Sequence, residues 1–165
     1  NAVNSVLAAK PGMVLDPGCG NGALLKKLLD ANPSIIPFGI DSESSRIGHA
    51  RLLLPSFADN FVVGDLFDVE SLWPEGRRYA IALLMPGRLL EVTPERASRF
   101  RTRLLAQCDR VLIYTYKDSW LVRYGTLRGL ATAAGLEVID ADEEMGVGFA
   151  EVFGPNIGEM RTASP

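Results

Sequence analysis

The stretch VLDPGCGNG, residues 14–22, decides the fold of this chain. An apolar run ends in Asp16, and three glycines follow it at alternating positions, Gly18, Gly20 and Gly22. A leucine-rich pattern with helical spacing begins directly afterwards, so the stretch predicts a strand, a glycine turn and a helix. Glycine leaves no Cβ between backbone and ligand, and the first amides of a helix attract negative groups. The stretch therefore predicts a site for a small ligand.

Two classes of cofactor are compatible with the spacing of this loop. Gly18, Gly20 and Ala23 satisfy the loose dinucleotide pattern G-x-G-x-x-A, in which helix amides meet a pyrophosphate. Asp16, however, places a carboxylate beside the loop, where it would repel two phosphates. The spacing leaves an NAD-type site open, whereas the carboxylate favours a ligand that carries positive charge.

Asp-Pro-Gly-Cys-Gly-Asn-Gly, residues 16–22, closely resembles motif I of the class I S-adenosylmethionine-dependent methyltransferases. Their ligand carries a sulfonium, an ammonium and no phosphate. The resemblance extends over residues 13–153 and implies an α/β fold, a three-layer Rossmann-like methyltransferase sandwich. Its seven-stranded, mostly parallel sheet would have the order 3-2-1-4-5-7-6, with strand 7 antiparallel. The resemblance also implies S-adenosylmethionine as cofactor and S-adenosylhomocysteine as product.

Apolar runs that predict strands alternate with helical patterns along most of the chain, which is typical of a parallel sheet with right-handed crossovers. The first three runs end in acids, Asp16, Asp41 and Asp65. Strands are predicted at residues 13–15, 35–41, 61–65, 79–85, 111–116, 136–139 and 148–153. Helices are predicted at residues 2–10, 24–31, 42–54, 94–104 and from about 120 or 126 to 134.

The ends of the first three strands are the predicted binding positions, because open α/β sheets bind ligands beyond the carboxyl ends of their strands. Asp41 follows Gly22 by 19 residues, about the offset at which an acid meets ribose hydroxyls. The resemblance assigns Asp41 to the ribose, Asp65 and Leu66 to the adenine, and Asp16 with the loop backbone to the methionine end. The predicted cofactor-binding set is Asp16, Gly18, Cys19, Gly20, Asp41, Ser42, Asp65, Leu66 and Met85.

The sequence assigns no catalytic base. Methyl transfer from a sulfonium depends mainly on placing the nucleophile against the methyl group, and a base is needed only when the nucleophile must lose a proton early. After strand four the family's base-amine methylases often carry Asn-Pro-Pro-Tyr, whereas this chain has Leu-Met-Pro-Gly-Arg at residues 84–88. That difference argues against methylation of nucleic-acid base amines of this type. The catalytic candidates are Arg88, Glu91 and Tyr116.

Composition sets the remaining limits. The chain has 165 residues, 47% of them hydrophobic and 22% charged, which predicts one methyltransferase domain over residues 1–154 and a flexible tail over 155–165. His49, Cys19 and Cys108 form no metal-ligand spacing, so no metal is expected. Two distant cysteines favour a reduced, cytoplasmic setting, and no segment has membrane-span length. A net charge of −3 argues against nucleic-acid binding.

The sequence therefore predicts an S-adenosylmethionine-dependent methyltransferase, a transferase of EC 2.1.1 type. Its acceptor is expected to be a small or medium-sized metabolite, with a protein acceptor as the other possibility. The family's N-terminal lid helices have no counterpart in the pattern, which implies an open site or a longer natural chain. The alternative is a methyltransferase-like module that binds cofactor, or acts as a scaffold, without catalysis.

Overall fold

The computed structural model describes residues 12–68, 74, 76–115, 118–142 and 149–153. The chain divides into two compact units, Asn1–Ala82 and Leu83–Pro165. The boundary between them falls inside a strand, β4 (Tyr79–Leu84). The helix predicted at residues 2–10 and the tail at 155–165 lie outside the described residues.

The first unit contains parallel strands in the hydrogen-bonded order β3-β2-β1-β4. Leu15 of β1 lies opposite Phe38 of β2 and Ala82 of β4, and Gly39 of β2 lies opposite Phe61 of β3. The strands agree with three of the apolar runs that end in acids. In chain order the elements are β1 (Met13–Pro17), α2 (Ala23–Ala31), β2 (Ile36–Asp41), α3 (Ser44–Leu53), η1 (Pro55–Asn60) and β3 (Phe61–Val63).

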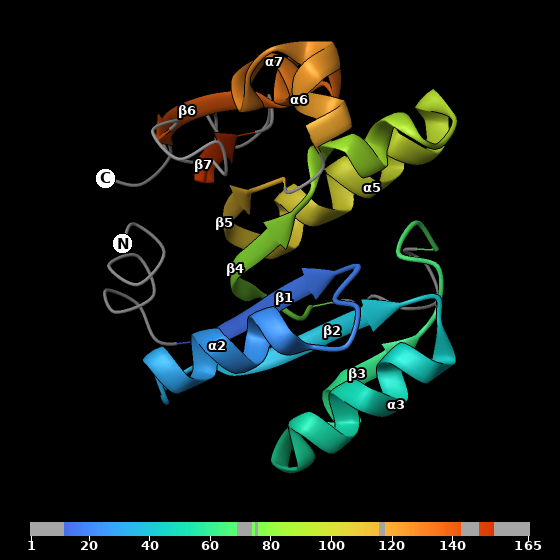
Figure 1. The fold of residues 1–165 in the computed structure, drawn as a ribbon, viewed down its shortest axis with the longest axis vertical. Helices are drawn as coiled ribbons and strands as arrows, with labels where there is room; N and C mark the ends of the chain where they lie inside the picture. Colours follow the sequence, from blue (N-terminus) through green and yellow to red (C-terminus); the bar gives the residue numbers. More distant parts are fainter. Residues whose placement is uncertain (1–11, 69–73, 75, 116–117, 143–148, 154–165) are drawn as a thin grey trace. The chain divides into compact units, whose positions relative to one another are not determined.

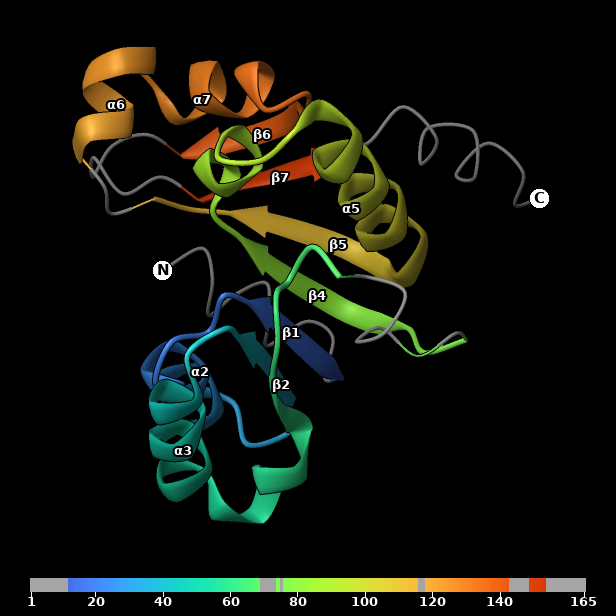
Figure 2. The same cartoon turned by 90° about the vertical axis from the view of Figure 1, so that its right-hand side faces the viewer.

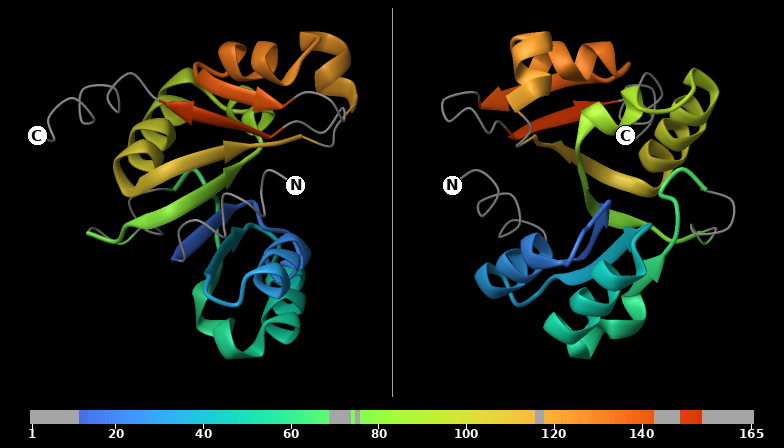
Figure 3. Two further views of the ribbon diagram at one scale, coloured as in Figure 1. Left: turned by 90° about the vertical axis from the view of Figure 1, so that its left-hand side faces the viewer. Right: turned by 45° about the vertical axis from the view of Figure 1, so that its right-hand side comes forward.

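Helices α2 and α3 lie side by side on one face of these strands (Figures 1 and 3). Leu25 and Leu28 of α2 are buried, whereas its exposed side carries an ion pair of Lys26 with Asp30 at 2.5 Å. Helix α3 buries Ile47 and Ala50 in the same way. The spacing of three and four residues between apolar positions thus decides which side of each helix faces the sheet.

The second unit continues from β4 with β5, β7 and β6 in that hydrogen-bonded order, and β7 is antiparallel to both of its neighbours. The pairing of β6 with β7 shifts register between Val138 and Asp140. In chain order its elements after β4 are η2 (Pro86–Leu90), α5 (Pro94–Gln107), β5 (Cys108–Ile113), α6 (Asp118–Tyr124), α7 (Leu127–Ala133), β6 (Glu137–Asp142) and β7 (Phe149–Phe153).

Helix α5 lies along β5, and α7 lies along β6 (Figure 2). The predicted core stripe of α5, Ala97, Phe100 and Leu104, is buried. Of the two starts expected for the helix that ends near 134, about 120 or 126, the second agrees with α7, and a separate helix, α6, precedes it. Gly125 separates them with a φ of +77°, which only glycine adopts readily, and the Thr126 side chain then caps α7 by accepting from Gly129 N at 3.0 Å.

Within the part of the chain that the structure describes, no helix combines the length and the apolar character needed to cross a membrane.

Candidate functional site

The loop between β1 and α2 is tied to the carboxyl end of β2. The amides of Gly18 and Cys19 both donate to the carbonyl of Ile40, at 2.7 and 3.0 Å. Gly18, Gly20 and Gly22 have φ angles of +94°, +56° and +77°, a region that side chains disfavour. The three alternating glycines are therefore required by the path of the turn, which brings bare backbone to the end of the sheet.

Asp41 is the anchor of this loop. It is buried at the end of β2, where its Oδ2 accepts from Gly20 N and its Oδ1 accepts from Glu43 N, each at 2.9 Å. A carboxylate oxygen has two acceptor positions, so each oxygen of Asp41 can still accept one further bond. Asp41 therefore holds the loop in place and can also accept from two neighbouring hydroxyls of a ligand.

Asp16 lies at the end of β1 and is 2% exposed. Its Oδ1 is buried and has no hydrogen-bond partner among the residues that the structure describes. Burial, and after it the charge of Asp41, raises the pKa of the Asp16 carboxyl to about 7. A buried oxygen without a donor is costly, so this carboxyl is suited to a ligand that brings positive charge or a donor.

The side chain of Cys19 points into the first unit. Its thiol donates to the Gly20 carbonyl at 3.6 Å, and burial, followed by the charges of Asp16 and Asp41, raises the pKa of the thiol. The thiol packs where β2 has no side chain, because a Cβ on Gly39 would lie 2.6 Å from Cys19 Sγ. The predicted contribution of Cys19 to a cofactor site would therefore come from its backbone.

Replacing Gly39 by alanine is expected to destabilise the chain by about 1–3 kcal/mol, because the new Cβ would also lie 2.7 Å from the Phe61 ring. Urea unfolding followed by far-UV circular dichroism measures this loss. Gly48→Ala is the matched control, since nothing lies within 4 Å of its Cβ position and alanine favours helix α3. Equal stability of Gly39→Ala and the wild type would contradict this packing of the loop.

The end of β3 also reaches this loop. Gly64 N donates to the Asp41 carbonyl at 3.0 Å, and a Cβ placed on Gly18 would lie 3.7 Å from Leu66 Cδ2. Asp65 is exposed, and its Oδ1 accepts from Phe67 N at 2.9 Å. Ser42, which follows Asp41, is exposed as well. The first unit thus gathers every predicted cofactor residue except Met85 around the ends of three strands.

The other candidates belong to the second unit. Met85 is 4% exposed at the end of β4. Arg88 and Glu91 form an ion pair at 2.9 Å in and after η2. Trp120 packs its indole against the backbone of Gly87, where a side chain would collide with the ring. Tyr116 lies outside the described residues.

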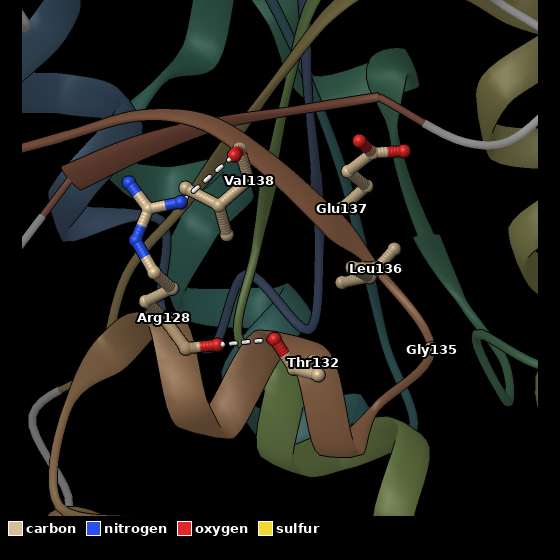
Figure 4. A pocket seen from close by; sticks show the side chains of 6 residues that line it. All are labelled: Arg128, Thr132, Gly135, Leu136, Glu137 and Val138. Atoms are coloured by element: carbon tan, nitrogen blue, oxygen red, sulfur yellow. Dashed lines mark hydrogen bonds between the residues drawn. The ribbon is translucent and has the colours of Figure 1, made fainter.

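A shallow hollow in the second unit lies between α7 and β6 (Figure 4). The Arg128 guanidinium donates to the Val138 carbonyl at 3.0 Å, and Thr132 Oγ1 donates to the Arg128 carbonyl at 2.9 Å. Val138 borders the register shift of β6, so Arg128 satisfies a carbonyl at an irregular position of the sheet. We assign these contacts to stability. Among the described residues, no group of His, Cys, Asp or Glu is arranged to hold a metal ion.

Three backbone features of the site were not predicted from the sequence. They are the Ile40 carbonyl that receives two loop amides, the bare backbone of Gly39, and the Gly64 amide bound to Asp41. A glycine inside an otherwise apolar strand was a usable signal for Gly39, because such glycines often mark close approach of another segment. The three backbone hydrogen bonds, two to Ile40 and one to Asp41, leave no signal in the side-chain pattern.

No protein-family model matches this chain. A curated relative, a putative tRNA methyltransferase of Mycoplasma pneumoniae, is 34% identical over 67 residues, which are 40% of this chain and 32% of the relative. The chain therefore spans about a third of the length of this relative.

Solved structures with a similar fold include two O-methyltransferases. An O-methyltransferase family protein from Burkholderia thailandensis has a TM-score of 0.64 at 16% identity, covering 93% of this chain and 55% of that one. NcsB1, an O-methyltransferase from neocarzinostatin biosynthesis in complex with S-adenosylmethionine and 2-hydroxy-5-methyl naphthoic acid, has a TM-score of 0.56 at 22% identity, covering 87% and 49%. Both likenesses concern the fold, and the chain spans about half of each structure.

Proposed function

We propose that this chain, which has the Rossmann-like α/β fold of the class I methyltransferases, binds S-adenosylmethionine and transfers its methyl group to an acceptor. The observation that carries the proposal is Asp41, a buried carboxylate held by two backbone amides beside a glycine loop. Each of its oxygens keeps one acceptor position, which suits the two neighbouring hydroxyls of a ribose.

The residues of the first unit fit the rest of the cofactor. Asp16 has a buried oxygen that no described residue donates to, and the ammonium of the methionine end would satisfy it. The backbone of Gly18, Cys19 and Gly20 would lie along that end. The other residues that we propose to contact the cofactor are Ser42, Asp65, Leu66 and Met85.

The same geometry argues against an NAD-type site. In a dinucleotide site the loop amides must be available to a pyrophosphate, whereas here Gly20 N already donates to Asp41 Oδ2. Asp16 is buried beside the loop as well, so a pyrophosphate would meet a carboxyl group that has no role in a dinucleotide site. We therefore expect binding of a ligand with positive charge and no phosphate.

S-adenosylmethionine supplies an electrophilic methyl group on a sulfonium. The residues of this chain would bind and orient it, because proximity and alignment account for most of the acceleration of an in-line displacement. Arg88, Glu91 and Tyr116 remain our candidates for contacts with the acceptor. A general base is required only for an acceptor that must lose its proton early.

We infer a small or medium-sized metabolite as acceptor, supported by the small-molecule O-methyltransferases that share the fold. Transfer RNA is a second candidate, because a curated relative that matches 40% of this chain is a putative tRNA methyltransferase. Incubation with labelled cofactor distinguishes the two classes of acceptor, because phenolic or carboxylic metabolites and total tRNA are recovered in different fractions. A scaffold without catalysis would label neither.

Arg88→Ala is expected to raise KM for an anionic acceptor about tenfold or more, because a guanidinium–carboxylate bond contributes about 1.5–3 kcal/mol. Affinity for S-adenosylmethionine should stay unchanged. Steady-state kinetics with a hydroxy-aromatic acid and with its uncharged amide make the comparison. Arg99→Ala is the control, because it removes an exposed guanidinium of α5 in the same unit, outside the candidate acceptor residues. An equal effect on the two acceptors would remove Arg88 from the acceptor site.

Three further proposals follow from the same assignment. The strand orders of the two units would form the continuous sheet 3-2-1-4-5-7-6 of the family, within one domain over residues 1–154. The protein would act in the cytoplasm, consistent with the buried thiols of Cys19 and Cys108.

Calorimetric titration with S-adenosylmethionine, S-adenosylhomocysteine and NAD tests the proposed function. We expect micromolar binding of the first two ligands and none of NAD. Binding of NAD alone would replace the proposal with the dinucleotide interpretation.

A further inference from the structure

The two buried carboxyl groups of the loop are held unequally. Asp41 receives one backbone N–H on each oxygen, from Gly20 and Glu43, both at 2.9 Å. Asp16 is more deeply buried, and its Oδ1 receives no donor from the described residues. Donors that point at a carboxylate stabilise its charged form, and burial without donors disfavours that form. Of the pair, Asp16 is therefore the member that holds a proton.

Among the residues that the structure describes, no positive charge acts on Asp16. The titratable group that acts on Asp16 is Asp41 from β2, and Asp16 in turn raises the pKa of the Cys19 thiol. Strand β4 contributes the apolar residues Ile81 and Ala82 where it pairs with β1, and the first turn of α2 contains no acid. Burial and the charge of Asp41 together raise the pKa of Asp16 to about 7. A cation is thus the missing partner.

We propose, on the basis of the cofactor site proposed above, that Asp16 is protonated in the empty chain and gives up its proton when the ammonium of the cofactor binds. The O–H bond of the carboxyl breaks, the proton passes to the buffer, and the resulting carboxylate pairs with the ammonium. Binding of the cofactor is then coupled to the release of one proton from the protein.

Calorimetry at pH 6 in buffers of low and high ionisation enthalpy measures this release directly. The ammonium of the free ligand is fully protonated at that pH, because the pKa of an α-amino group is about 8. We expect up to about one proton released per S-adenosylmethionine or S-adenosylhomocysteine bound. Methylthioadenosine, which lacks the ammonium, should bind without release. Asp16→Asn should abolish the release, whereas Asp30→Asn, on the exposed side of α2, should retain it.

The outcomes separate this inference from the proposed function. If both cofactor forms bind with heats that do not depend on the buffer, or if Asp16→Asn still releases a proton, the inference is wrong and the cofactor assignment stands. If neither binds, the cofactor assignment is wrong, and carboxyl ¹³C NMR of the empty chain decides the protonation of Asp16. A carboxyl signal that titrates near neutral pH in the wild type and is missing in Asp16→Asn would support the protonation of Asp16. The absence of such a signal in the wild type would overturn it.

Discussion

Replacing Asp41 by alanine is expected to weaken the binding of S-adenosylmethionine by at least about 100-fold. The carboxylate would lose two bonds to ribose hydroxyls, and hydrogen bonds to a charged group contribute about 1.5–3 kcal/mol each. The substitution would also remove the two acceptors that hold Gly20 N and Glu43 N at 2.9 Å, so the loop would lose its anchor. Calorimetric titration of the purified variant with S-adenosylmethionine measures the loss.

The control for this prediction must separate the loss of a ligand contact from a general loss of structure. Asp59→Ala removes an exposed carboxylate of η1 in the same unit, and it should bind the cofactor as the wild type does. Unfolding of both variants in urea shows whether Asp41→Ala is folded under the conditions of the titration. A folded Asp41→Ala chain with wild-type affinity would show that the ribose lies elsewhere.

The elements of the fold were largely predictable, because their signals are local. Apolar runs that end in acids give β1, β2 and β3, and the buried positions of α2, α3 and α5 follow the helical spacing of their apolar residues. The prediction of an α/β Rossmann-like fold is confirmed. The division into α6 and α7 was missed, since a single Gly125 in an otherwise helical pattern is also compatible with a continuous helix.

The candidate site was predictable as a set of strand ends but not as a set of contacts. Parallel strands bring their carboxyl ends to one edge, which explains why the charge of Asp41 acts on Asp16. The direction of the Cys19 side chain depends on the bare backbone of Gly39, a contact between segments distant in sequence. The assignment of each residue to a part of the cofactor stays a prediction.

Asp16 is the residue for which the structure adds most to the prediction from the sequence. The sequence shows an acid beside a glycine loop and therefore predicts attraction for a cation. The structure adds that Oδ1 of this acid is buried and receives no donor from the described residues, while Asp41 accepts from two backbone amides. In the empty chain, an ionised carboxyl in that position lowers the free energy of unfolding, and the size of this effect depends on pH.

The free energy of unfolding is expected to fall by about 2–3 kcal/mol between pH 5 and pH 8 because of Asp16 alone. The pKa of this carboxyl is raised from 3.8 to about 7 on folding, so the native state binds the proton more tightly than the unfolded state. Its contribution to stability is therefore fully present below pH ~4, declines as the pH rises towards 7, and is constant above that range. Urea unfolding at pH 5, 6, 7 and 8 measures the decline.

Asp16→Asn isolates this contribution, because the amide has nearly the same shape and does not titrate in this range. The stability of the variant relative to the wild type should improve steadily from pH 5 to pH 8, whereas Asp30→Asn should follow the wild type at every pH. Parallel curves for Asp16→Asn and the wild type would show that Asp16 is already ionised at pH 5. Saturating S-adenosylmethionine should flatten the wild-type curve, because a cation beside Asp16 favours the ionised carboxyl and lowers its pKa in the folded state.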